Sequence, residues 1–87
     1  GYTTLMTGKW HVGDRPEHWP RQRGFDHYFG LPFGSSSFFR VTAERPLVDE
    51  DQVLRPPDDS FYLTDLFTDH AVKFLDQHGR GPKPFFL

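Results

Sequence analysis

The chain has 87 residues, a formal net charge of −2 and no cysteine. This length allows at most one small domain, which buries a smaller fraction of its surface than a larger domain does. The slightly acidic balance argues against a nucleic-acid partner, because a phosphate backbone attracts clustered lysines and arginines, and the arginines at 15, 21 and 23 are interleaved with acidic residues. No disulfide or thiolate metal site is possible in this stretch. No apolar run approaches the roughly 20 residues of a membrane-spanning helix.

Aromatic residues make up 17% of the chain, and ten of them are phenylalanines. Each buried ring removes about 150 to 250 Å² from water, so the sequence is typical of a globular chain. The phenylalanine-rich segments flank a long middle rich in turn residues, and both ends interrupt patterned sequence. We therefore expect residues 1–87 to be one part of a longer domain, incomplete at both ends, and to fold poorly when isolated.

Residues 2–12 form the first patterned stretch, in which side chains alternate between two faces. This alternation predicts a strand over residues 3–8 that runs into a loop presenting Lys9 and His11. On an extended backbone these two side chains share one face, and Trp10 turns into the packing on the other. Residues 13–34 are interrupted so often by proline and glycine that a loop without regular structure is predicted, held in place by its aromatic side chains.

Residues 40–57 are expected to be peripheral, with a small hairpin whose turn is the acidic run 49–51. Residues 58–60 suit the start of a helix. Apolar residues at spacings of three or four predict that helix over residues 62–78, capped by Ser60 or Thr64 and carrying Asp65 in its first turn. Residues 84–87 predict a buried strand. A helix followed by a buried strand indicates an α/β fold with a mostly parallel sheet flanked by helices.

Several ordered blocks of the sequence resemble the sulfatase family. The block 1–13 contains Lys9-Trp10-His11 and is similar to the Gly-Tyr…Gly-Lys-Trp-His-x-Gly motif of that family. The block 23–30 resembles the Gly-Phe-Asp…Gly segment that follows in bacterial arylsulfatases. Residues 61–75 and 84–87 are similar to the helix and the Pro-Phe-Phe-Leu strand that come later. Blocks in this order are far more specific than one short motif.

The resemblance implies an alkaline-phosphatase-like α/β fold, of which residues 1–87 are part of the N-terminal catalytic domain. It implies hydrolysis of a sulfate ester, carried by a small molecule or a carbohydrate, with a formylglycine nucleophile and a Ca²⁺ ion. Both lie outside this segment: there is no cysteine, the serines are not in the nucleophile motif, and no metal ligand is assigned here. A formylglycine-generating or sulfatase-maturing enzyme is an implied partner, and a periplasmic or secreted location is compatible with the family.

Within the segment, Lys9 and His11 are the predicted catalytic residues. Lys9 supplies a compact charge that stabilises an anion, and His11 can donate to an anion or exchange a proton near neutral pH. The resemblance implies that Lys9 bridges the formylglycine and a sulfate oxygen, and that His11 contacts the formylglycine hydroxyl. His18 follows in the next loop and is a weaker candidate for substrate binding. His27, His70 and His78 are interpreted as structural.

Two alternatives to a sulfatase stay open. One is a phosphonate or phosphate ester hydrolase of the same superfamily, and the other is a non-catalytic sulfatase-like binding module. The isolated segment is predicted to have no sulfatase activity, because it lacks the nucleophile.

Overall fold

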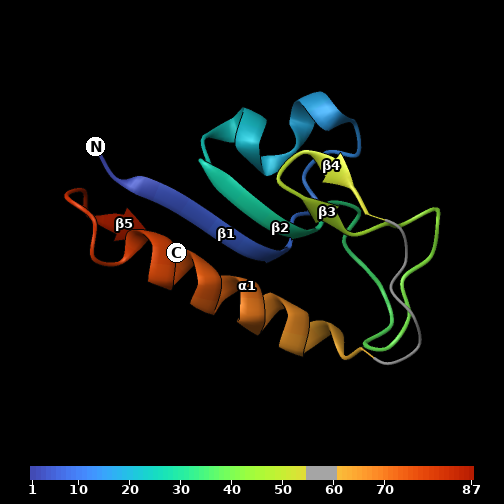
Figure 1. Ribbon diagram of the computed structural model, residues 1–87. Helices are drawn as coiled ribbons and strands as arrows, with labels where there is room; N and C mark the ends of the chain where they lie inside the picture. Colours follow the sequence, from blue (N-terminus) through green and yellow to red (C-terminus); the bar gives the residue numbers. More distant parts are fainter. Residues whose placement is uncertain (55–60) are drawn as a thin grey trace.

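The computed structural model describes residues 1–54 and 61–87. A five-stranded sheet with the order β4-β3-β2-β1-β5 is covered on one face by a single long helix, α1 (Figure 1). The elements in chain order are β1 Thr3–Lys9, the 3-10 helices η1 Pro16–His18 and η2 Pro20–Arg23, β2 His27–Leu31, β3 Val48–Asp49, β4 Gln52–Val53, α1 Leu63–His78 and β5 Phe85–Phe86. The predicted α/β class is confirmed.

The centre of the sheet is parallel and one side is antiparallel. Strand β1 pairs in parallel with β2 and with β5, whereas β2 pairs antiparallel with β3 and β3 with β4. The two short strands β3 and β4 form the predicted hairpin, with Glu50 and Asp51 at its turn. Glu50 adopts a left-handed backbone (φ 61°), and its side chain accepts a hydrogen bond from the backbone N–H of Tyr28. The acidic turn therefore also secures the neighbouring strand β2.

Strand β2 contradicts the prediction of an irregular segment over residues 13–34. The strand contains Gly30, which the sequence analysis treated as a turn residue, and the parallel register sets Gly30 opposite Gly8. A side-chain Cβ at Gly30 would overlap the carbonyl oxygen of Gly8. That carbonyl accepts a hydrogen bond of 3.1 Å from the hydroxyl of Tyr28, and burial raises the pKa of this phenol. Gly30 is thus required by close strand pairing and does not mark a turn.

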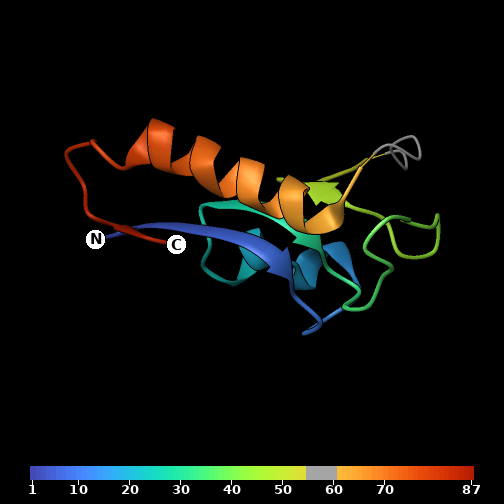
Figure 2. The same cartoon turned by 90° about the horizontal axis from the view of Figure 1, so that it is seen from below.

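Two apolar clusters lie on opposite faces of the sheet. On the α1 side the buried residues are Leu5, Phe29, Leu31, Val41, Leu47, Leu63 and Phe74. On the other side Trp19, Tyr28 and Val48 are buried beneath the short 3-10 helices (Figure 2). The region 40–57 was predicted to be peripheral, which is wrong for Val41, Leu47 and Val48, because hairpin packing draws these side chains into the core.

Helix α1 begins and ends close to the predicted positions. Its N-cap residue is Tyr62, which makes no side-chain capping bond, so the prediction that Thr64 caps the helix is wrong; Ser60 and residues 58–59 lie outside the described residues. Asp65 lies in the first turn, as predicted. Strand β5 forms at the predicted place, but Phe85 and Phe86 are exposed, because only β1 pairs with β5 in the described sheet.

The Gly-Phe-Asp block fastens the loop after η2 to the start of β1. The Asp26 carboxylate accepts a 2.9 Å hydrogen bond from the backbone N–H of Thr4, and this bond holds the pKa of Asp26 below its usual range. The Thr4 hydroxyl donates to the carbonyl oxygen of Gly24 at 2.7 Å. These contacts place η1 and η2 over one face of the sheet, close to the residues that follow β1.

The imidazole of His70 on α1 lies flat on the ring of Phe29. Their ring centroids are 3.5 Å apart and the planes differ by 2°. Burial lowers the pKa of His70, and the carboxylate of Asp49 opposes this effect in part. The stacking matches the interpretation of His70 as a packed, structural residue.

A pH dependence follows for the stability of the full-length protein. Because the pKa of His70 is lower in the folded state, the unfolded state binds the proton more readily. The neutral ring of His70 therefore stabilises the folded state fully above the unfolded pKa of about 6.5. This stabilisation is lost as the pH falls from there through the lower pKa of the folded state. We expect the melting temperature of the His70→Phe variant to fall less than that of the unaltered protein between about pH 7 and pH 5. Equal decreases would contradict this role.

Candidate active-site edge

The sheet brings the sequence motif to one edge. Parallel strands β1 and β2 end at the same side of the sheet, where Lys9 is the last residue of β1 and is paired with Leu31 of β2. The carboxyl ends of parallel strands are where α/β proteins bind ligands. The Lys9 side chain is exposed there, on the same strand face as Leu5. Residues 32–47 continue beyond the tips of both strands (Figures 1 and 2).

The backbone turns sharply at His11. Hydrogen bonds from the N–H of Trp10 to the carbonyl of Leu31 and from the N–H of His11 to that of Pro32, both 3.0 Å long, continue the parallel pairing past β1. His11 itself has a left-handed backbone with φ 55°. The prediction that Lys9 and His11 share a face because the backbone is extended is therefore wrong at His11. A turned backbone at this position sets the direction of the imidazole independently of Lys9.

Gly34 makes room for the His11 ring. A Cβ atom at Gly34 would lie 2.5 Å from Cγ and 2.7 Å from Nδ1 of that ring, and Gly34 has a φ of 92°. Both the contact and the left-handed backbone favour glycine here. Gly34 is not among the site residues predicted from the sequence. A glycine shortly after the end of a strand was the available signal, but it was read only as a turn residue.

Trp10 anchors the turn between the two candidate residues. Its indole Nε1 donates a 2.8 Å hydrogen bond to the carbonyl oxygen of His18, and its ring packs edge-on against Phe25 with centroids 6.2 Å apart. Trp10 also packs against the cluster of Trp19, Tyr28 and Val48. The prediction that Trp10 turns into the packing is confirmed. Fixing this residue fixes the backbone on either side of it.

His18 is tied to the site through its backbone. It lies at the end of η1, is half-buried, and its Cβ packs against Gly13, whose φ is 143°. In the described part of the chain its imidazole makes no hydrogen bond or ion pair. The structure therefore brings His18 close to Trp10 through the carbonyl oxygen of His18. The weaker assignment of His18 to substrate binding stays a prediction.

The ion pairs of the described residues lie elsewhere in the chain. Within residues 1–54 and 61–87, the ion pairs join Arg15 to Glu17, Arg21 to Glu50 and Asp51, and His27 to Glu50. None of them includes Lys9 or His11. The positive charge of Lys9 is thus not neutralised by a carboxylate of the described chain, which suits a residue that receives an anion.

The described residues were also compared with the groups that the family resemblance implies. Residues 1–54 and 61–87 contain no cluster of three or more His, Cys, Asp or Glu side chains that could hold a metal ion. A Ca²⁺ ion prefers six to eight oxygen ligands, so these residues do not fit it. Within the same ranges, no helix is long and apolar enough to cross a membrane.

Comparison with known proteins identifies the family. The chain is 35% identical over 98 residues to mouse N-acetylgalactosamine-6-sulfatase and 34% identical over 95 residues to mouse arylsulfatase J, with all of this chain covered in both cases. It covers 19% and 16% of those proteins, respectively, and 22% of mouse arylsulfatase G. No protein-family model matches.

Solved structures agree with the sequence relatives. The crystal structure of Ps i-CgsB in complex with k-i-k-neocarrahexaose superposes with a TM-score of 0.78 at 31% identity, over 99% of this chain and 22% of the other. The fold is therefore that of a segment from a larger α/β domain. The chain belongs to the sulfatase family and spans about a fifth of the length of the relatives that it matches.

The contact between Gly34 and His11 can be tested by substitution. In the full-length protein we expect Gly34→Ala to shift the NMR resonances of the His11 ring, because the added Cβ displaces it. Gly24→Ala is the matched control: Gly24 also has a left-handed backbone (φ 111°), but nothing lies within 4 Å of its Cβ position. Both variants should lose about 1 to 2 kcal/mol of stability through backbone strain. An unmoved His11 resonance in Gly34→Ala would refute the contact.

Proposed function

We propose that the full-length protein hydrolyses sulfate esters, and that Lys9 and His11 of this segment act at the sulfate. The observation that carries the proposal is the position of Lys9-Trp10-His11 at the carboxyl end of β1, in a chain aligned over its whole length with sulfatases. Residues 1–87 then represent part of the N-terminal catalytic domain.

Lys9 stabilises negative charge. A sulfate ester spreads its charge over non-bridging oxygens, and bond cleavage moves further charge onto the departing oxygen. An exposed ammonium group at a fixed strand end can meet that charge without reorganising. This role is supported by the ion pairs of the described residues, none of which includes Lys9.

His11 handles a proton. An imidazole can accept a proton at one ring nitrogen or donate one near neutral pH. The left-handed backbone, the bond to Pro32 and the packing on Gly34 together restrict where this ring can lie. Restriction of this kind supports a general acid–base role, because proton transfer requires a defined distance to the reacting group.

The implied formylglycine and Ca²⁺ belong to other parts of the protein. A formylglycine, when present, would supply the attacking hydroxyl, and Ca²⁺ would neutralise the sulfate. The chain has no cysteine, and residues 1–54 and 61–87 hold no ligand cluster for the metal ion. No chemical step is therefore assigned here to either group. The modification would require the maturing enzyme that the family resemblance implies.

A carbohydrate sulfate is the substrate class that the relatives favour. One relative is an N-acetylgalactosamine-6-sulfatase, and the Ps i-CgsB structure contains an oligosaccharide. The alternatives are a phosphonate or phosphate ester hydrolase and a non-catalytic binding module. The nucleophile motif of the full-length protein distinguishes the binding module from an enzyme. Only an enzyme needs a Cys or Ser in the motif Cys/Ser-x-Pro/Ala-x-Arg.

Substitution of Lys9 tests the proposal. In the full-length protein, Lys9→Ala should reduce kcat for an aryl sulfate by about 10²-fold or more, the scale of losing one charge-stabilising donor. Lys73→Ala, which removes an exposed lysine on α1, is the control and should leave the rate unchanged. If the two variants hydrolyse the aryl sulfate equally fast, Lys9 is not in the site.

A further inference from the structure

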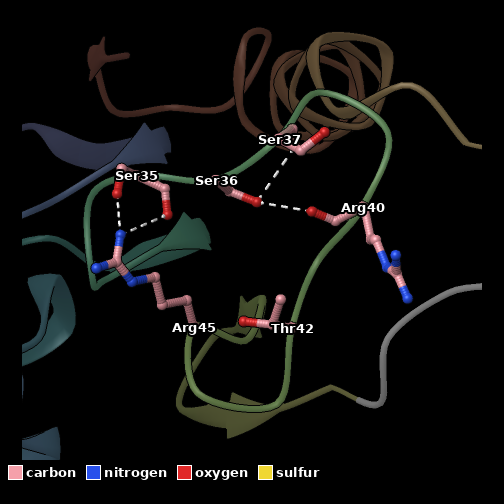
Figure 3. A pocket seen from close by; sticks show the side chains of 6 residues that line it. All are labelled: Ser35, Ser36, Ser37, Arg40, Thr42 and Arg45. Carbon is pink, nitrogen blue, oxygen red and sulfur yellow. Dashed lines mark hydrogen bonds between the residues drawn. The ribbon is translucent and has the colours of Figure 1, made fainter.

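A cavity of about 370 Å³ lies in the loop that follows β2 (Figure 3). It is lined by Ser35, Ser36, Ser37, Arg40, Thr42 and Arg45. It begins one residue after Gly34, the glycine that contacts the His11 ring. The loop that forms it leaves the sheet at the end of β2, where Lys9 also lies. The cavity therefore adjoins the edge at which we place the sulfate ester.

Arg45 is held in a fixed position at this cavity. Its Nη1 donates to the backbone carbonyl of Ser35 at 3.4 Å and to the hydroxyl oxygen of the same serine. Its backbone N–H donates to the carbonyl of Thr42 at 3.2 Å, which closes a tight turn over residues 42–45. The hydrogen bonds of the described residues engage only Nη1 of the guanidinium, so the N–H groups of Nε and Nη2 can receive an anion.

The rest of the loop is also braced. The Ser36 hydroxyl lies 3.0 Å from the carbonyl oxygen of Arg40, which ties the two sides of the loop together. The backbone N–H of Leu63 donates to the carbonyl of Phe38 at 2.6 Å, which fastens the loop to the start of α1. A braced cavity loses less entropy when it binds a ligand than an unrestrained loop does.

The chemistry of the lining favours an anion. Two arginines and four hydroxyl groups line the cavity, and no carboxylate does so among the described residues. None of the ion pairs in residues 1–54 and 61–87 includes Arg40 or Arg45. A guanidinium fork with hydroxyl donors matches the oxygens of a sulfate or carboxylate group.

We propose that this cavity is a subsite for a second anionic group of the substrate, a sulfate or carboxylate on the sugar unit next to the ester that is cleaved. The inference rests on the proposed function and narrows its substrate class to polyanionic saccharides. Arg45 binds the second anion through its guanidinium, the Ser35 hydroxyl lies beside that group, and Thr42 lines the same cavity (Figure 3).

A selectivity ratio in the full-length protein tests the subsite. We compare kcat/KM for a disulfated disaccharide with kcat/KM for the corresponding monosulfated disaccharide. Arg45→Met should lower this ratio by about 10- to 100-fold, the effect of losing a charge-assisted hydrogen-bonded contact. Arg45→Lys keeps the charge without the fork and should lower it less. The control Arg23→Met removes an exposed arginine at the end of η2, away from the cavity, and should leave both values unchanged.

The outcomes separate the subsite from the proposed function. Suppose that the unaltered protein hydrolyses both disaccharides, and that Arg45→Met and Arg45→Lys both have the same selectivity ratio as the unaltered protein. The subsite is then wrong, and the sulfatase function stands. If the unaltered protein hydrolyses neither, both proposals are overturned. If Arg45→Met fails to fold, the ratio measured for Arg45→Lys decides, and an unchanged ratio rejects the subsite.

Discussion

The close parallel pairing of β1 with β2 is the constraint on which the rest of the structure depends. Gly30 faces Gly8 without room for a side chain, and the Tyr28 hydroxyl bonds to the Gly8 carbonyl. The register that results makes both strands end together and carries the hydrogen bonding on through His11. Because of this register, the residues after β2 come to lie against the residues after β1, and Gly34 can receive the His11 ring.

In the motif Lys9-Trp10-His11, the tryptophan anchors the backbone and the two polar residues are exposed. Trp10 is fixed by its bond to His18 and its packing on Phe25, whereas Lys9 and His11 on either side of it are exposed. A partly buried aromatic residue between two exposed polar ones limits how far the backbone can move. Catalytic groups need this support, because small displacements weaken electrostatic stabilisation and proton transfer.

The sequence predicted the elements whose patterns are local and missed strand β2, which depends on pairing with a distant segment. Periodic apolar residues were sufficient for α1, and alternation was sufficient for β1. The strand β2 was missed because Gly30 weakens a strand by its own propensity, and only the approach of Gly8 explains it. The same reason hid Gly34 and the turn at His11, since their conformations follow from contacts between separate segments. Lys9 and His11 were selected from the family resemblance, and their roles stay predictions.

The central claim is that Lys9-Trp10-His11 serves a sulfatase site in the full-length protein, and one comparison of substrates addresses it most directly. The full-length protein is assayed with an aryl sulfate and with the matching aryl phosphonate ester, and the phenol that both reactions release is measured. We expect a clear preference for the sulfate ester. Preferential cleavage of the phosphonate would contradict the claim in favour of the related ester hydrolases, and cleavage of neither would contradict it in favour of a binding module.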